Sequence, residues 1–174
     1  VQPMVDETAR RGAPFHGALY AGLALTAGGP KVIEFNARFG DPETQALIPR
    51  LQSDFGEVVL ATATGDLSGT KLEWSSRPCV TIVLASGGYP GPYDTGYEIH
   101  GLDDAAAVSD VQVFHAGTRA EGDSVVTAGG RVLNVSALGD TFAAARERAY
   151  EAASRIEFEK VHFRRDVAER AVKQ

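Results

Sequence analysis

The sequence is poor in cysteine and contains no long apolar run. Cys79 is the one cysteine among 174 residues, and it stands inside the apolar run 79–85. A single thiol forms no disulfide within the chain, which is typical of proteins from reducing compartments, so we expect a cytoplasmic protein in which Cys79 packs as a small core residue. A membrane-spanning helix needs ~20 apolar residues. No run approaches that length and no signal peptide opens the chain, so we predict no membrane partner.

Positive charge is also scarce. The chain has 17 lysine and arginine residues against 23 aspartate and glutamate residues, which gives a formal net charge of -6 at pH 7. Proteins that bind nucleic acids usually show a basic excess, so we predict no nucleic-acid partner. Small phosphate ligands stay compatible with this charge, because a few well-placed cations or one metal ion neutralise them locally.

Several common catalytic motifs are missing as well. The chain contains no Gly-x-Gly-x-x-Gly, no Walker loop, no His-Glu-x-x-His and no Gly-x-Ser-x-Gly. The four histidines are scattered and lack the spacing of a zinc site; they are His16, His100, His115 and His162. The corresponding dehydrogenase, zinc-protease and serine-hydrolase chemistries are therefore not indicated.

The segment 31–43 carries the clearest sign of chemistry. It follows the turn residues 28–30, and the branched and aromatic side chains of its first half predict a strand. Side chains alternate across a strand, so Glu34, Asn36 and Arg38 are expected on one face and the apolar residues between them on the other. Packing in a hydrophobic core would explain the apolar face, whereas the polar face needs another explanation.

A carboxylate, an amide and a guanidinium in one row suit a metal ion with an anionic ligand. Glu34 and Asn36 offer hard oxygen ligands of the kind that Mg²⁺ prefers, and Arg38 can bind phosphate oxygens in a bidentate manner. The alternative is an ordinary half-exposed strand with an ion pair between Glu34 and Arg38. The residues that follow favour chemistry, because Asp41 and Glu43 add further carboxylates at a tight bend.

Other elements are predicted from local patterns. We expect an antiparallel hairpin of residues 16–26 with the strand above, a helix that begins near Ser53 or Asp54 and ends at Gly65, and a last major helix capped by Asp140. The remaining expected elements are a helix over 3–11, strands over 79–86 and 111–118, a hairpin of 125–127 with 132–137 around Gly129-Gly130, and a short helix from Arg165 onward.

Residues 35–45, Phe-Asn-Ala-Arg-Phe-Gly-Asp-Pro-Glu-Thr-Gln, closely resemble the signature of the phosphoribosylamine–glycine ligase family of ATP-grasp enzymes. Further stretches match that family in the same order; they are 17–23, 88–90, 114–118 and 129–133. The resemblance extends over nearly the whole chain, and co-linear matches are more specific than any single motif.

The resemblance implies an α+β fold. Residues 1–70 are expected to form the second lobe of an ATP-grasp fold, an antiparallel sheet with helices, and residues 71–174 a small β-rich C-terminal domain with a closing helix. Members of the family carry a substrate domain and the first ATP-grasp lobe ahead of this region. The resemblance therefore implies a C-terminal portion, inactive alone, whose partner is the N-terminal remainder of the same enzyme.

The same resemblance implies an ATP-dependent carboxylate–amine ligase of de novo purine biosynthesis. Such an enzyme joins glycine to 5-phosphoribosylamine through a glycyl phosphate, and it releases ADP and phosphate. The resemblance implies that Glu34 and Asn36 bind Mg²⁺ or Mn²⁺ and that Arg38 is the catalytic group that neutralises the transferred phosphoryl group. The implied substrate contacts are Asp41, Glu43 and Arg131.

Other interpretations stay open at this point. The chain is alternatively a non-catalytic module that keeps the fold as a binding or dimerisation surface, or another ATP-grasp ligase with a different acid or amine. For single residues, Asp41 alternatively caps a helix, Glu43 compensates the helix dipole, and Arg131 belongs to a structural turn next to glycines. The ending 164–168 departs from the family pattern, which affects only the expected C-terminal packing.

Overall fold

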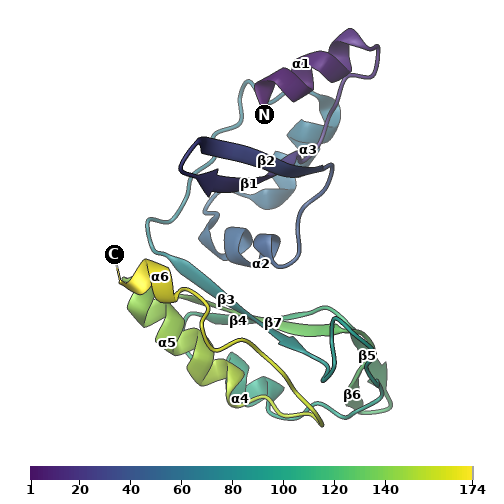
Figure 1. The fold of residues 1–174 in the computed structure, drawn as a ribbon, viewed down its shortest axis with the longest axis vertical. Coiled ribbons are helices and arrows are strands. Elements are labelled where there is room, and N and C mark those ends of the chain that lie inside the picture. The colour runs from purple at the N-terminus through teal and green to yellow at the C-terminus, as the bar shows by residue number, and fades with distance from the viewer. Residues whose placement is uncertain (174) are drawn as a thin grey trace. The chain divides into compact units, whose positions relative to one another are not determined.

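A computed structural model describes residues 1–173 (Figure 1). The chain divides into two compact units. Unit 1 comprises residues 1–44 and 51–74, and unit 2 comprises residues 45–50 and the chain from Ser75 onward. The predicted division between residues 70 and 71 stays a prediction. The mixture of helices and antiparallel sheets confirms the expected α+β class.

Unit 1 is built around a two-stranded hairpin. Its elements are α1 (Gln2–Arg10), β1 (Tyr20–Thr26), β2 (Gly29–Asn36) and α3 (Phe55–Thr64). The segment α2 (Glu43–Leu47) begins in unit 1 and is followed by the 3-10 helix η1 (Ile48–Arg50), which belongs to unit 2.

The β1–β2 hairpin confirms the predicted antiparallel pairing, although β1 begins at Tyr20 rather than at residue 16. The register shifts between Gly22 and Leu23, so the hairpin contains a bulge at this point. Its apolar side chains are unusually open to solvent: Leu25 is 88% exposed and Ile33 is 71% exposed. Leu23 and its register partner Val32 are also more than half exposed, and exposed apolar groups that lie together are typical of surfaces that pack against further protein.

The helix α3 begins and ends where its sequence predicts. The carboxylate of Asp54 accepts a hydrogen bond from the backbone N–H of Glu57 at 3.0 Å, which satisfies one of the unpaired donors of the first turn. Gly65 ends the helix with φ 78°, in the left-handed region that glycine adopts without steric cost.

Unit 2 contains a three-stranded sheet, a small two-stranded sheet and helices. Its elements are β3 (Cys79–Ala85), α4 (Leu102–Ala106), β4 (Val111–His115), β5 (Thr118–Glu121), β6 (Ser124–Thr127), β7 (Arg131–Leu138), α5 (Phe142–Ala153) and α6 (Glu169–Val172). The larger sheet has the order β3-β7-β4 with all pairs antiparallel, and α5 covers one of its faces (Figure 1).

The core of unit 2 lies between this sheet and α5. Small residues on the helix allow it to approach the sheet closely, and Ala145, Ala149 and Ala152 are fully buried. The sheet contributes apolar residues that alternate along its strands, as expected for one covered face; they are Val80, Ile82, Leu84, Leu133, Val135 and Ala137.

Cys79 is half-buried at the start of β3, and burial raises the pKa of its thiol. Among residues 1–173, no helix combines the length and the hydropathy that a membrane crossing requires.

The predicted hairpin around Gly129-Gly130 is wrong. The strand β6 pairs with β5, whereas β7 pairs with β3 and β4, so the two glycines connect different sheets. Tertiary packing explains this path: Gly130 is buried against the ring of Tyr89, and a Cβ on Gly117 would lie 2.7 Å from the Cα of Gly129. The predicted strand 111–118 is also interrupted here. The strand β4 ends at His115, the close approach at Gly117 follows, and β5 begins at Thr118.

The predicted cap of the last major helix is also wrong. Thr141 is the N-cap of α5, and its hydroxyl accepts from the backbone N–H of Ala144 at 3.1 Å. Asp140 instead accepts from Nε of Arg77 at 3.1 Å. The expected helix from Arg165 onward is shorter than predicted, since α6 begins at Glu169.

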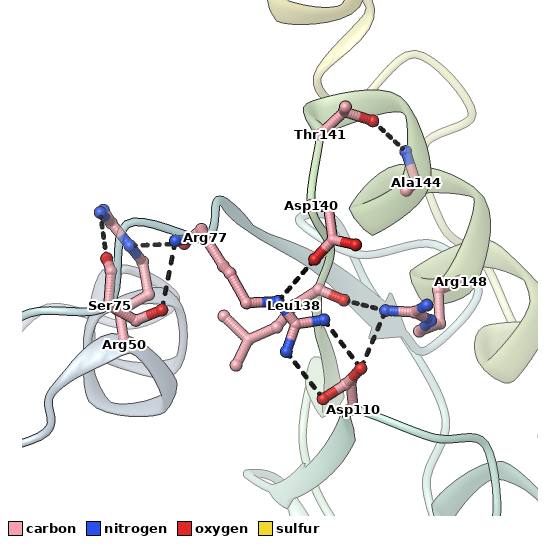
Figure 2. A network of polar contacts seen from close by, with 9 residues as sticks. All are labelled: Arg50, Ser75, Arg77, Asp110, Leu138, Asp140, Thr141, Ala144 and Arg148. Carbon is pink, nitrogen blue, oxygen red and sulfur yellow. Dashed lines mark hydrogen bonds and ion pairs between the residues drawn. The ribbon is translucent and has the colours of Figure 1, made fainter.

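Arg77 connects segments that are far apart in the sequence of unit 2 (Figure 2). It makes a bidentate contact with Asp110, with nitrogen–oxygen distances of 3.0 and 2.8 Å. Asp110 also accepts from Arg148 of α5 at 3.2 Å, and Arg148 donates to the carbonyl of Leu138. The network therefore joins the chain before β3 to the end of β7 and to α5.

Arg77 lowers the pKa of Asp110, mainly through this hydrogen bond. A carboxylate with a lowered folded-state pKa stabilises the fold above the pKa of an unfolded aspartate, about 3.9, and this contribution is lost as the pH falls through the folded-state value.

We predict that Asp110→Asn lowers the midpoint of thermal unfolding by about 1–3 °C at pH 7, a modest value because the groups are partly exposed. The difference from wild type should shrink as the pH falls below about 4. Calorimetry at pH 7 and at a pH below about 4 measures this difference in the unfolding midpoint. Asp123→Asn, on the exposed turn between β5 and β6, is the matched control. A deficit that persists undiminished at acidic pH would contradict the ionic contribution of Asp110.

Candidate functional site

Glu34 and Asn36 lie on the same face of β2. The side-chain amide of Asn36 donates to Oε1 of Glu34 at 3.0 Å. Glu34 is exposed and Asn36 is half-buried, so this acid–amide pair is open to a small ligand. The alternation of strand side chains places both groups together, as the sequence predicts.

The strand β1 places Tyr20 and Gly22 opposite this pair. Tyr20 is the register partner of Asn36, and Gly22 is the partner of Glu34. A Cβ on Gly22 would lie 3.1 Å from Cγ of Glu34, which is closer than ordinary van der Waals contact. Glycine at this position therefore leaves room for the Glu34 side chain on the face of the hairpin.

Glu43 enters the same region from the first turn of α2. The hydroxyl of Tyr20 donates to Oε1 of Glu43 at 3.4 Å. On its other side the carboxyl group lies against Gly40, where a Cβ would stand 2.9 Å from Cδ of Glu43. Tyr20, Glu34, Asn36 and Glu43 form what we call the hairpin site.

Negative charge surrounds the Tyr20 hydroxyl. The charge of Glu43 raises the pKa of Tyr20, and burial, the hydrogen bond to Glu43 and the charge of Glu34 act in the same direction. The phenol therefore keeps its proton through the physiological pH range and stays a hydrogen-bond donor.

The sequence predicts Arg38 on the same strand face as Glu34, which requires that β2 extend as far as residue 38. The strand β2 ends at Asn36, so the alternation of a strand does not extend to Arg38. Its Nη1 donates to the backbone carbonyl of Phe39 at 3.1 Å. The expected catalytic role of Arg38 stays a prediction. Asp41 is half-buried in a cis Asp41-Pro42 turn just before α2, and its expected substrate contact also stays a prediction.

Arg131 belongs to unit 2, where it is the first residue of β7. It is exposed, and its backbone carbonyl accepts from the N–H of Gly117 at 2.9 Å. The glycines beside it allow two segments of backbone to approach closely, which fits the structural turn that was the alternative interpretation. A substrate contact of the Arg131 side chain stays a prediction.

The donor set of the hairpin site fits a hard cation that is shared with a phosphate ligand. Carboxylate and amide oxygens are suitable ligands, and Mg²⁺ usually takes only one or two carboxylates while water and phosphate complete its octahedron. In the part of the chain that the structure describes, no cluster of three or more His, Cys, Asp or Glu residues could hold a metal ion.

Tyr20 was not predicted as a site residue. If β1 and β2 kept the register that they have next to the turn, Tyr20 would lie opposite Phe35, on the apolar face. The bulge after Gly22 shifts the register by one residue and brings Tyr20 opposite Asn36 instead. The sequence contains the signal, an aromatic hydroxyl within the stretch 17–23, but it does not show on which face of the strand this hydroxyl lies.

Comparison with known proteins identifies relatives of both units. The family model described as phosphoribosylglycinamide synthetase, C domain, matches residues 79–170. The model described as phosphoribosylglycinamide synthetase, ATP-grasp (A) domain, matches residues 1–44. The C-domain match alone covers more than half of the chain.

Curated relatives and solved structures agree with these models. The chain is 53% identical over 174 residues to the phosphoribosylamine–glycine ligase of Streptomyces coelicolor, covering 98% of the chain and 42% of that protein. It is 47% identical to the chloroplastic phosphoribosylamine–glycine ligase of Arabidopsis thaliana, of which it covers 34%. The crystal structure of phosphoribosylamine–glycine ligase from Thermotoga maritima superposes with a TM-score of 0.74 at 35% identity, covering 91% of the chain and 39% of that protein.

A more distant neighbour shows the fold alone. N5-carboxyaminoimidazole ribonucleotide synthetase from Thermotoga maritima superposes with a TM-score of 0.57 at 16% identity and covers 82% of the chain. In all these comparisons the chain spans well under half the length of the relative; for the curated relatives cited it spans 34–42%.

We predict that Glu43→Gln lowers the pKa of the Tyr20 phenol toward its ordinary value of about 10, because the main cause of the raised pKa is removed. Titration of the Tyr20 ¹³Cζ resonance measures this change. Glu73→Gln, which removes an exposed carboxylate bound to Lys71, serves as the control. An identical Tyr20 titration in wild type and Glu43→Gln would show that the two groups do not meet in solution.

Proposed function

The chain belongs to the phosphoribosylglycinamide synthetase family, and we propose on this basis that it supplies part of the active site of an ATP-dependent ligase that joins glycine to 5-phosphoribosylamine. The product is glycinamide ribonucleotide, an intermediate of de novo purine biosynthesis, and we place the reaction in the cytoplasm. The observation that carries the proposal is the hairpin site, where an acid–amide pair on β2 and a further carboxylate in the first turn of α2 lie at and next to the family signature of residues 35–45.

The proposed reaction has two steps. An oxygen of the glycine carboxylate forms a bond to the γ-phosphorus of ATP, the bond to the leaving ADP breaks, and glycyl phosphate results. The amine of phosphoribosylamine then attacks the carbonyl carbon, phosphate leaves, and the nitrogen loses a proton. The main physical difficulty is the approach of two anions, the carboxylate and the polyphosphate.

Polar and charged residues of the chain are proposed to reduce this repulsion. Glu34 and Asn36 would hold Mg²⁺ or Mn²⁺, which when bound neutralises phosphate charge. Arg38 is proposed to contact the transferred phosphoryl group, with its guanidinium released from the Phe39 carbonyl. Asp41 and Glu43 are proposed to bind amine groups of the substrates, and Arg131 to contact a substrate or the nucleotide.

The partner that we propose is the remainder of the same kind of enzyme, which in the relatives makes up more than half of the length. The hairpin exposes Leu25, Val32 and Ile33, each by more than half of its surface. Removing such side chains from water is favourable by roughly 25 cal/mol per Å² of apolar area, which offsets part of the entropy lost on association. The alternative of a stand-alone binding module explains these exposed residues equally well but gives no reason for the acid–amide pair.

A chimaera tests the proposed activity. Residues 1–174 replace the matching segment of the Streptomyces coelicolor ligase, and formation of glycinamide ribonucleotide from ATP, glycine and phosphoribosylamine is measured. We predict that the chimaera turns over and that the 174-residue chain alone does not.

Within that chimaera, Glu34→Gln should lower turnover by at least about tenfold, since it removes the one carboxylate of the acid–amide pair. Glu73→Gln should match wild type. Equal rates for the two variants, or full activity of the isolated chain, would argue against the proposal.

We also predict that Mn²⁺ added to the 174-residue chain together with ATP broadens the side-chain NMR signals of Glu34 and Asn36, and that excess Mg²⁺ reverses the broadening. Glu34→Gln should abolish the effect at Asn36, whereas Glu73→Gln should retain it. Unchanged signals at both positions under saturating metal and nucleotide would favour the non-catalytic module.

A further inference from the structure

Tyr20 and Glu43 meet although they belong to separate elements. Tyr20 is the first residue of β1, Glu43 is the first residue of α2, and 23 positions of sequence separate them. The hydrogen bond from the Tyr20 hydroxyl to Glu43 Oε1 is 3.4 Å long and partly buried. This contact therefore links β1, which pairs with the strand of the acid–amide pair, to the first turn of α2 within the family signature.

The position of the Glu43 carboxyl group is restricted from two sides. Tyr20 lies at Oε1, and the buried backbone of Gly40 lies against Oε2 and Cδ. Thr44 completes the turn, because its backbone N–H donates to the carbonyl of Gly40 at 3.0 Å. The side chain of Glu43 is thus confined to a narrow space that only a glycine at position 40 leaves open.

A phenol is well suited to hold a carboxylate in place. It donates one hydrogen bond and carries no charge, so the full negative charge of Glu43 stays available to a cationic ligand. A lysine or arginine at the same position would neutralise that charge. The ammonium group of glycine, which is charged at neutral pH, is the cation that the proposed reaction brings to this region.

We infer that Tyr20 is a positioning residue for glycine, whose hydroxyl holds the Glu43 carboxylate next to the acid–amide pair so that this carboxylate binds the glycine ammonium group. The inference rests on the proposed function and adds a residue and a substrate to it. Tyr20 itself touches Glu43 and takes no part in bond formation.

The test uses the chimaera described above with Tyr20→Phe, which removes one oxygen and keeps the ring. The hydrogen bond reaches a charged group but is long, at 3.4 Å, so we expect the KM for glycine to rise about 5- to 30-fold. The KM for ATP, the KM for phosphoribosylamine and the kcat should each change by less than about twofold. Tyr93→Phe, which removes the same atom from an exposed loop tyrosine of unit 2, should leave all constants unchanged.

A double-mutant cycle with Glu43→Gln separates positioning from packing. If Tyr20 acts through Glu43, Tyr20→Phe should have no further effect on the KM for glycine once Glu43 is Gln.

The inference is overturned if Tyr20→Phe and Tyr93→Phe behave alike. It is overturned as well if the loss falls on the KM for ATP or phosphoribosylamine, or if Tyr20→Phe and Glu43→Gln act additively. Each of these results would leave the ligase activity of the chimaera, and so the proposed function, intact. A chimaera without turnover would instead overturn the proposed function and this inference together.

Discussion

The antiparallel register of β1 and β2 is the constraint on which the hairpin site depends. With the bulge after Gly22, Tyr20 faces Asn36 and Gly22 faces Glu34. Without it, the register would move by one residue and every side chain of β1 before the bulge would exchange faces. One irregular position thus decides whether Tyr20 lies opposite Asn36, and whether Gly22 rather than Ala21 lies opposite Glu34.

Unit 2 contributes structure more clearly than chemistry. Its sheet and α5 form a closed apolar core, and the network of Arg77, Asp110 and Arg148 fastens the chain before β3 to that core (Figure 2). The family model for the C domain matches this unit almost throughout. Of the residues expected to act in the reaction, only Arg131 lies in unit 2. The glycines that precede it are explained by packing, because two backbone segments approach closely there.

The sequence predicts what depends on neighbours along the chain and fails where distant contacts decide. Alternation along one strand places Glu34 and Asn36 together, and the capping pattern at Asp54 gives the ends of α3. The partner of β7 was missed because Gly129-Gly130 has the composition of a hairpin turn, whereas packing against Tyr89 and Gly117 leads the chain into another sheet. Alternation does not place Arg38, because β2 ends at Asn36 and nothing local in the sequence marks that end.

We propose that the acid–amide pair and Glu43 form one site for metal-bound phosphate and for an amine. The most direct test is a crystal structure of the chimaera with Mn²⁺, a non-hydrolysable ATP analogue and glycine. An anomalous difference map locates the metal in it. We expect a manganese peak bonded to oxygens of Glu34 and Asn36 and to the nucleotide phosphates, with the glycine nitrogen at hydrogen-bond distance from Glu43. Metal bound elsewhere, with these three side chains away from both ligands, would contradict it.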